Sequence, residues 1–247
     1  MISRRKVVLA LGASAFAPRP SFAQQQPKVR RIGFLAVRSR STSSNPEPNY
    51  DVFVQGMREF GYAEGRNLVI EWRFAEGKYE RLPALAAELT QLKPEVIVTQ
   101  STPATEALRR ATSSIPIVTA AVGDPVGSGF AVSLARPGGN VTGLSVIVTE
   151  SSGKHVELLK NALPQLSRFA LLVNPGNTSV HEDLFKAVQT TAKKLGLTVL
   201  RVDARSAEDI DRGFNAMTKE RAGAVMVAND AFFIRSEERR VGKECRL

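Results

Sequence analysis

The chain has 247 residues, of which 43% are hydrophobic and 23% charged, so it can bury a substantial core and is neither fibrous nor disordered in bulk. Its formal net charge is +10, but more than half of this excess lies in residues 1–23 and 235–247. The middle of the chain is therefore only mildly basic, which argues against a nucleic-acid-binding protein.

Residue types needed for catalysis or for a metal are scarce. The one cysteine, Cys245, excludes an internal disulfide and a thiolate cluster, and the two histidines argue against a His-based metal site. His155 and His181 fall among polar neighbours on helical stretches, and we interpret both as solvated surface side chains. The sequence has no G-x-G-x-x-G turn, P-loop or G-x-S-x-G elbow. We therefore expect no enzyme activity, no cofactor and no metal.

Residues 1–23 are predicted to be an export signal. Basic residues at 4–6 precede an apolar run at 7–17, and the small residues of a cleavage site follow at 21–23. A twin-arginine signal and an ordinary secretory signal are both open alternatives. Because the apolar run is too short to span a bilayer and no cysteine for a lipid follows it, the mature protein is expected in the periplasm.

The other end of the chain is unusual. Residues 235–247 have no apolar periodicity and resemble the translation of a sequencing adapter. We predict a non-native tail here, so that the natural C-terminal part would be missing; a genuine basic tail is the alternative.

Strands and helices alternate through residues 29–145, which predicts a first lobe of parallel strands with helices on both faces. Thr102 is expected to cap one helix, with Pro103 in its first turn. Trp72 and Phe74 are expected to pack under helices rather than line a cleft. The expected strands are 31–37, 68–74, 95–100 and 115–122, and the other expected helices are 50–60 and 79–93.

The stretch Ile115–Ser145 joins the two halves of the chain. It indicates a buried strand, a polar loop, a short helix, a glycine turn and a second extended segment that leads into a second lobe. A small ligand would then sit between the lobes, beside Asp124.

Residues 146–234 repeat the alternation with fewer strands, so we predict a partial second lobe. Ser179 with Glu182 is expected to form a capping box, and Ser206 to cap a later helix. The expected helices are 153–163, 180–195 and 207–221, and the expected strands are 168–173, 197–203 and 224–229.

Polar residues at the carboxyl ends of these strands are candidate ligand contacts, because ligands of parallel sheets bind there. Ser101 and Thr102 either cap a helix or offer hydroxyls and free amides to a ligand carboxylate. Asp124 either caps loop amides or faces a cleft. Asn177 is either a turn residue or a contact, and Asp230 either ends its strand or pairs with a ligand ammonium. The full candidate set is Ser101, Thr102, Asp124, Asn174, Asn177 and Asp230.

Residues 29–234 resemble a known family, the ABC-transporter substrate-binding proteins related to tryptophan/tyrosine receptors. The most specific matches are GDPV at 123–126 and RPGGNVTG at 136–143, with IGFL at 32–35 and RLPALA at 81–86 in support. The chain departs from the family by stopping after Phe233, where members continue.

The resemblance implies an α/β protein with the type I periplasmic-binding-protein fold: two Rossmann-like lobes of parallel sheet flanked by helices, with the second lobe incomplete. It implies a small ligand, such as an amino acid, bound between lobes that close about a hinge. Ser101 and Thr102 would meet the carboxylate, Asp230 and Asn174 would hold the ammonium, and Asp124 would lie near the hinge. The implied partner is an ABC permease in the inner membrane.

Two other functions stay open at this point. The first is a periplasmic ligand sensor that feeds a signalling partner, and the second is an exported enzyme on a doubly wound fold. The export signal and the missing catalytic motifs argue against the enzyme.

Overall fold

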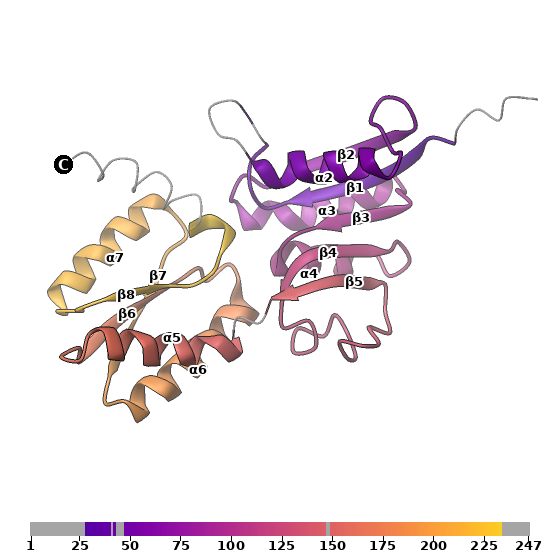
Figure 1. Cartoon of the computed structure of the whole chain (residues 1–247). Coiled ribbons are helices and arrows are strands. Elements are labelled where there is room, and N and C mark those ends of the chain that lie inside the picture. The colour runs from indigo at the N-terminus through magenta and orange to yellow at the C-terminus, as the bar shows by residue number, and fades with distance from the viewer. Residues whose placement is uncertain (1–27, 41, 43–46, 147–148, 234–247) are drawn as a thin grey trace, which may run out of the picture.

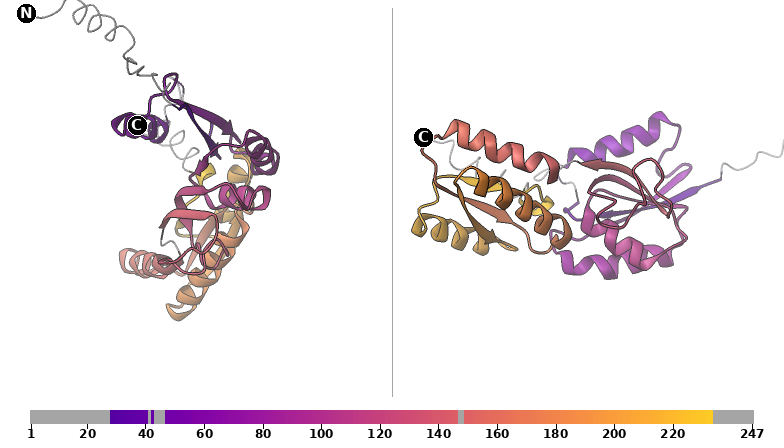
Figure 2. Two further views of the ribbon diagram at one scale, coloured as in Figure 1. Left: turned by 90° about the vertical axis from the view of Figure 1, so that its right-hand side faces the viewer. Right: turned by 90° about the horizontal axis from the view of Figure 1, so that it is seen from below.

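The computed structural model describes residues 28–40, 42, 47–146 and 149–233. The predicted export signal and the predicted non-native tail lie outside these ranges. The described residues form two parallel sheets, each with its own helices, that lie end to end in an elongated molecule (Figures 1 and 2).

The first sheet has five parallel strands in the order β2-β1-β3-β4-β5. Helix α2 packs on one face, over the aromatic core around Phe34, and α3 and α4 cover the other face, over Leu35 and Ile97. Side chains of β1 alternate between the two cores because successive residues of a strand point to opposite faces. The strands are β1 (Arg30–Ala36), β2 (Leu68–Phe74), β3 (Val96–Thr99), β4 (Ile117–Gly123) and β5 (Val141–Val146). The helices are α2 (Pro48–Glu59), η2 (Tyr79–Arg81), α3 (Leu82–Gln91) and α4 (Thr102–Ala111).

The second sheet has three parallel strands in the order β7-β6-β8. The central strand β6 is buried along most of its length, as a strand covered on both faces must be. Figure 1 shows α7 on one side of this sheet and α5 and α6 on the other. The elements are α5 (Thr149–Ala162), β6 (Arg168–Val173), α6 (Thr178–Lys194), β7 (Thr198–Asp203), α7 (Ala207–Lys219) and β8 (Val225–Val227).

The short helix predicted between β4 and β5 is absent. Residues 124–140 form a series of turns instead. Val132 and Leu134 are 80% and 70% exposed, so these two side chains do not stabilise a helix there by burial. The extended segment that follows is β5, which pairs with β4 and ends the first sheet. Leu144 on β5 is also largely exposed.

Two predicted helix caps are corrected. Ser101, and not Thr102, is the N-cap of α4, and its hydroxyl oxygen accepts a hydrogen bond from the Ala104 amide. Helix α6 starts earlier than expected, with Asn177 as its N-cap, so position 179 lies within the helix and is not its N-cap. The Asn177 side chain makes no capping hydrogen bond to the helix, and its Nδ2 donates to Asp230 instead.

The cap predicted at Ser206 is confirmed. The Ser206 hydroxyl accepts from the Asp209 amide, and the Asp209 carboxylate accepts from the Ser206 amide in return.

Within the part of the chain that is described, no helix combines the length and the apolar character needed to cross a membrane.

Candidate functional site

A cavity of about 530 Å³ lies between the two lobes. Its walls come from the carboxyl ends of strands in both sheets, where a doubly wound fold collects ligands. Lobe one contributes an apolar wall that includes Phe34, Phe53 and Val98, and polar residues that include Gln100, Ser101 and Thr102. Lobe two contributes Asn177, Val180, Asn229, Asp230 and Ala231.

The N-terminus of α4 forms one polar end of this cavity. Ser101 and Thr102 both line it, as predicted from their position after β3. The Thr102 hydroxyl oxygen accepts a hydrogen bond of 3.0 Å from the Gly123 amide, which ties α4 to the end of β4. Thr102 is therefore both a structural link and part of the cavity wall.

Asp230 is the most heavily bonded residue of the site. Its carboxylate is 3% exposed. The Oδ1 atom accepts from the Tyr79 hydroxyl at 2.8 Å, from Asn174 Nδ2 at 2.9 Å and from the Phe232 amide at 3.0 Å. The Oδ2 atom accepts from Asn177 Nδ2 at 3.1 Å. These donors replace the water that a buried carboxylate loses.

The interpretation of His181 as a surface residue was wrong. His181 is 1% exposed, its Nδ1 lies 3.0 Å from the Asn174 amide nitrogen, and its Nε2 lies 3.8 Å from Asp230 Oδ2. The spacing of 181, 184, 188 and 192 places it on the buried face of α6, a signal that the sequence did carry. His155 is exposed, as predicted.

Two buried polar atoms beside Asp230 have no hydrogen-bond partner among the described residues. They are Asn177 Oδ1 and His181 Nε2. Buried polar groups in folded proteins are nearly always satisfied. The Asn177 oxygen belongs to a residue that lines the cavity, so it offers an acceptor next to the Asp230 carboxylate.

Tyr79 was not predicted as a site residue. It lies in lobe one, lines the cavity and donates its hydroxyl proton to Asp230 in lobe two. Burial, followed by the negative charge of Asp230, raises the pKa of the Tyr79 hydroxyl well above its ordinary value. The phenol is therefore neutral and able to donate. No local sequence signal links two residues that are 151 positions apart.

The structure does not bring all six predicted residues to the cavity wall. Asn174 is buried behind Asp230 and supports it. Asp124 lies on an exposed turn with φ 39°, and its Oδ1 accepts from the Gly127 amide at 2.8 Å, which is the loop-capping arrangement. Arg38 also lines the cavity, where its Nε lies 2.8 Å from the buried carboxylate of Glu47.

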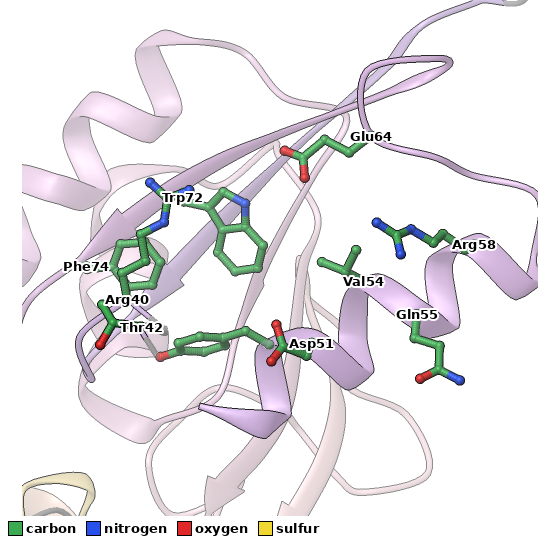
Figure 3. Close-up of a pocket in the computed structure, with 10 residues that line it drawn as sticks. Arg40, Thr42, Asp51, Val54, Gln55, Arg58, Glu64, Trp72 and Phe74 are labelled. Carbon is green, nitrogen blue, oxygen red and sulfur yellow. The ribbon is translucent and has the colours of Figure 1, made fainter. Parts of the chain in front are cut away.

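A second cavity, of about 850 Å³, lies on lobe one between α2 and the edge strand β2. Figure 3 shows Trp72 and Phe74 in its wall, with Val54 and Arg58 projecting from α2. Trp72 also packs against Phe34 and Phe53 beneath the helix. The expectation for Trp72 is thus half right, because the ring both packs under a helix and lines a hollow. The described residues contain no cluster of three metal-ligating side chains.

Comparisons with known proteins agree on one family. A tyrosine-binding protein from Clostridioides difficile (strain R20291) is 28% identical over 167 residues, which is 67% of this chain and 47% of that protein. The chain thus spans about half the length of this relative.

Several solved structures are similar to this chain. A conserved domain protein from Vibrio cholerae is 30% identical with a TM-score of 0.68, over 80% of this chain and 64% of that one. An ABC domain from Streptococcus pneumoniae, solved in complex with L-Trp, is 26% identical with a TM-score of 0.68, over 83% and 67%. A periplasmic binding protein from Burkholderia mallei, 13% identical with a TM-score of 0.58, shares the fold.

The fold is therefore that of the type I periplasmic binding proteins, with a second sheet that is smaller than the first. The family model described as "ABC transporter substrate binding protein" matches residues 47–236, most of the chain. This chain belongs to the ABC transporter substrate-binding protein family.

Proposed function

We propose that this protein is an extracytoplasmic receptor of an ABC importer that binds an amino acid with an aromatic side chain between its two lobes. The observation that carries the proposal is the cavity between the lobes, which is lined both by a helix N-terminus and by a buried carboxylate. This arrangement matches the two charges of a free amino acid.

The α4 N-terminus is the proposed subsite for the ligand carboxylate. The first amides of a helix have no partner inside the helix, and the helix dipole adds partial positive charge there. The hydroxyls of Ser101 and Thr102 lie at this end of the cavity and can donate to an anion, since their oxygens already accept from backbone amides.

Asp230 and Asn177 form the proposed subsite for the ligand ammonium. Asp230 Oδ1 is occupied by three donors, whereas Oδ2 has one. A carboxylate has about four acceptor positions, so Oδ2 retains capacity for another donor. Asn177 Oδ1 is the unsatisfied acceptor beside it. Asn174 supports this subsite from behind, and Asp124 has no part in it.

The apolar wall supports an aromatic ligand. Phe34 and Phe53 lie in the part of the cavity formed by lobe one, beside the polar end at α4. Aromatic rings favour edge-to-face or offset contact with other rings. The names of two relatives, a tyrosine-binding protein and a domain in complex with L-Trp, support the same ligand class.

Transport follows from closure in this proposal. A ligand that touches both lobes favours the state in which they are close, and this closed state docks on the permease. The predicted export signal supports a location outside the cytoplasm. Micromolar affinity corresponds to about 8 kcal/mol, which a few charge-assisted hydrogen bonds and an apolar wall can supply.

Calorimetric titration of the chain with L-tryptophan, L-tyrosine and L-lysine tests the proposal. We expect micromolar binding of an aromatic amino acid and much weaker binding of L-lysine, whose second ammonium would enter an apolar wall. Absence of binding heat and of thermal stabilisation with all aromatic amino acids would refute the function.

A further inference from the structure

We propose that Tyr79 is a positioning residue that couples the two lobes to the ligand by holding one oxygen of Asp230. This inference rests on the proposed amino-acid site. It assigns a role to a residue of lobe one that also lines the cavity.

Tyr79 is held firmly in lobe one. It starts η2, directly after the loop that follows β2, and its ring packs against the core between the sheet and helices α3 and α4. Its hydroxyl reaches lobe two, where it meets Asp230 Oδ1 at 2.8 Å.

Lobe two makes room for the Tyr79 ring. A side chain on Gly176 would place its first carbon 2.9 Å from Tyr79 Cδ2, which is too close for two carbon atoms. Gly176 is held in turn by its amide, which donates to Asn174 Oδ1 at 2.9 Å. The ring thus packs against the backbone of Gly176, which is hydrogen-bonded to Asn174, and Asn174 in turn donates to Asp230.

The contact determines which oxygen of Asp230 remains for a ligand. Tyr79, Asn174 and the Phe232 amide all donate to Oδ1, which fixes the plane of the carboxylate. Oδ2 then accepts from Asn177, which also lines the cavity, and remains the oxygen that a ligand can use. Loss of the Tyr79 donor would remove one of the three hydrogen bonds that hold Oδ1, and with it a hydrogen bond between the lobes.

One carboxylate therefore serves two partners. The ligand ammonium binds at Oδ2 while lobe one binds at Oδ1, so the position of the lobes and the occupancy of the cavity depend on each other. Such coupling is reciprocal. If the Tyr79–Asp230 hydrogen bond strengthens ligand binding by some factor, ligand binding favours formation of that hydrogen bond by the same factor.

The test compares Tyr79→Phe with the wild type and with Tyr62→Phe, a matched loss of one hydroxyl from an exposed tyrosine. Titrations use L-tryptophan and its deaminated analogue indole-3-propionate. We expect Tyr79→Phe to weaken L-tryptophan about tenfold and indole-3-propionate by less than twofold, because only the first ligand uses Asp230. Equal losses for both ligands, or no loss for L-tryptophan, would overturn the proposal.

A second measurement does not depend on any ligand. Small-angle scattering of the ligand-free protein should show a larger radius of gyration for Tyr79→Phe than for the wild type and Tyr62→Phe. If none of these proteins binds L-tryptophan, the proposed function fails. The scattering still tests whether the Tyr79–Asp230 hydrogen bond holds the lobes together. Identical scattering for all three proteins would refute the claim that this hydrogen bond holds the lobes together.

Discussion

The hydroxyl of Tyr79 lies 2.8 Å from Asp230 Oδ1, and this hydrogen bond joins the two lobes across 151 positions of sequence. Both residues line the cavity between the lobes. The pair therefore combines a contact that holds the fold together with a group available to a ligand.

The stability of the protein should fall steeply above pH 10. The folded state keeps the hydroxyls of Tyr79 and Tyr50 protonated, because burial and a nearby carboxylate raise both pKa values, whereas the unfolded chain loses these protons near pH 10. The unfolded state then binds fewer protons, so stability is complete below pH 10 and declines above it. The decline is about 1.4 kcal/mol per pH unit for each tyrosine.

Urea unfolding at pH 9, 10 and 11 measures this dependence. Tyr79→Phe removes one of the two groups, so its stability should decline less steeply with pH than that of the wild type. A variant with the same pH slope as the wild type would contradict the raised pKa of Tyr79.

Substitution of Asp230 should weaken ligand binding more than any change at Asp124. Asp230→Asn removes the charge and places an amide among four donors, so we expect at least a tenfold loss of affinity for L-tryptophan. Asp124→Asn is the control, because its side chain caps an exposed turn away from the cavity. Calorimetry that ranks the two variants in the opposite order would contradict the site.

The hydroxyl of Thr102 should matter for stability as well as for binding. Thr102→Val keeps the shape of the side chain but leaves the buried amide of Gly123 without its acceptor, at a cost of about 1–3 kcal/mol. Thr102→Ser retains the hydroxyl, so its free energy of unfolding should fall much less than that of Thr102→Val. Equal urea midpoints for the two variants would show that this hydrogen bond contributes little.

Gly143 should not tolerate a side chain. Its φ of 138° is unfavourable for other residues, and a Cβ there would lie 2.0 Å from the Thr119 carbonyl oxygen on β4. Gly143→Ala should therefore destabilise the first sheet by about 1–3 kcal/mol or more. Gly139→Ala, where nothing lies within 4 Å, is the matched control and should unfold close to the wild-type midpoint.

Removal of the Ser206 cap should destabilise helix α7. Ser206→Ala removes the acceptor for the Asp209 amide and should lower the free energy of unfolding by about 1 kcal/mol. Ser206→Asp keeps an acceptor at the cap and serves as the control. If both variants unfold at the same urea concentration, the capping box has no measurable effect on stability.

Local patterns were sufficient to predict much of the fold. All seven strands expected from apolar runs lie within two residues of observed strands, because such runs, bounded by turn residues, depend little on distant parts of the chain. The Ser206 cap was also found because its partner lies three residues away. Four predicted site residues, Ser101, Thr102, Asn177 and Asp230, line the cavity, since the ends of parallel strands meet at one edge.

The misses involve partners that are far away in sequence. Asn177 was predicted as either a turn residue or a ligand contact, but its hydrogen bond to Asp230, 53 positions later, was not predicted. Tyr79 looked like the start of an ordinary helix, and its role depends on a residue in the other lobe. The missing helix before β5 is a different case, because Val132 and Leu134 are exposed in the turns that take its place. His181 could have been found from the periodicity of α6.

Strand β5 ends the first sheet, and beside it Leu144 and Leu134 are each 70% exposed. Within the described ranges no further strand pairs with this edge, and such an edge, flanked by solvent-facing leucines, favours pairing with another molecule. The purified protein should accordingly form aggregates as its concentration rises. A charged residue in place of Leu144 should improve its solubility and leave the ligand cavity unchanged.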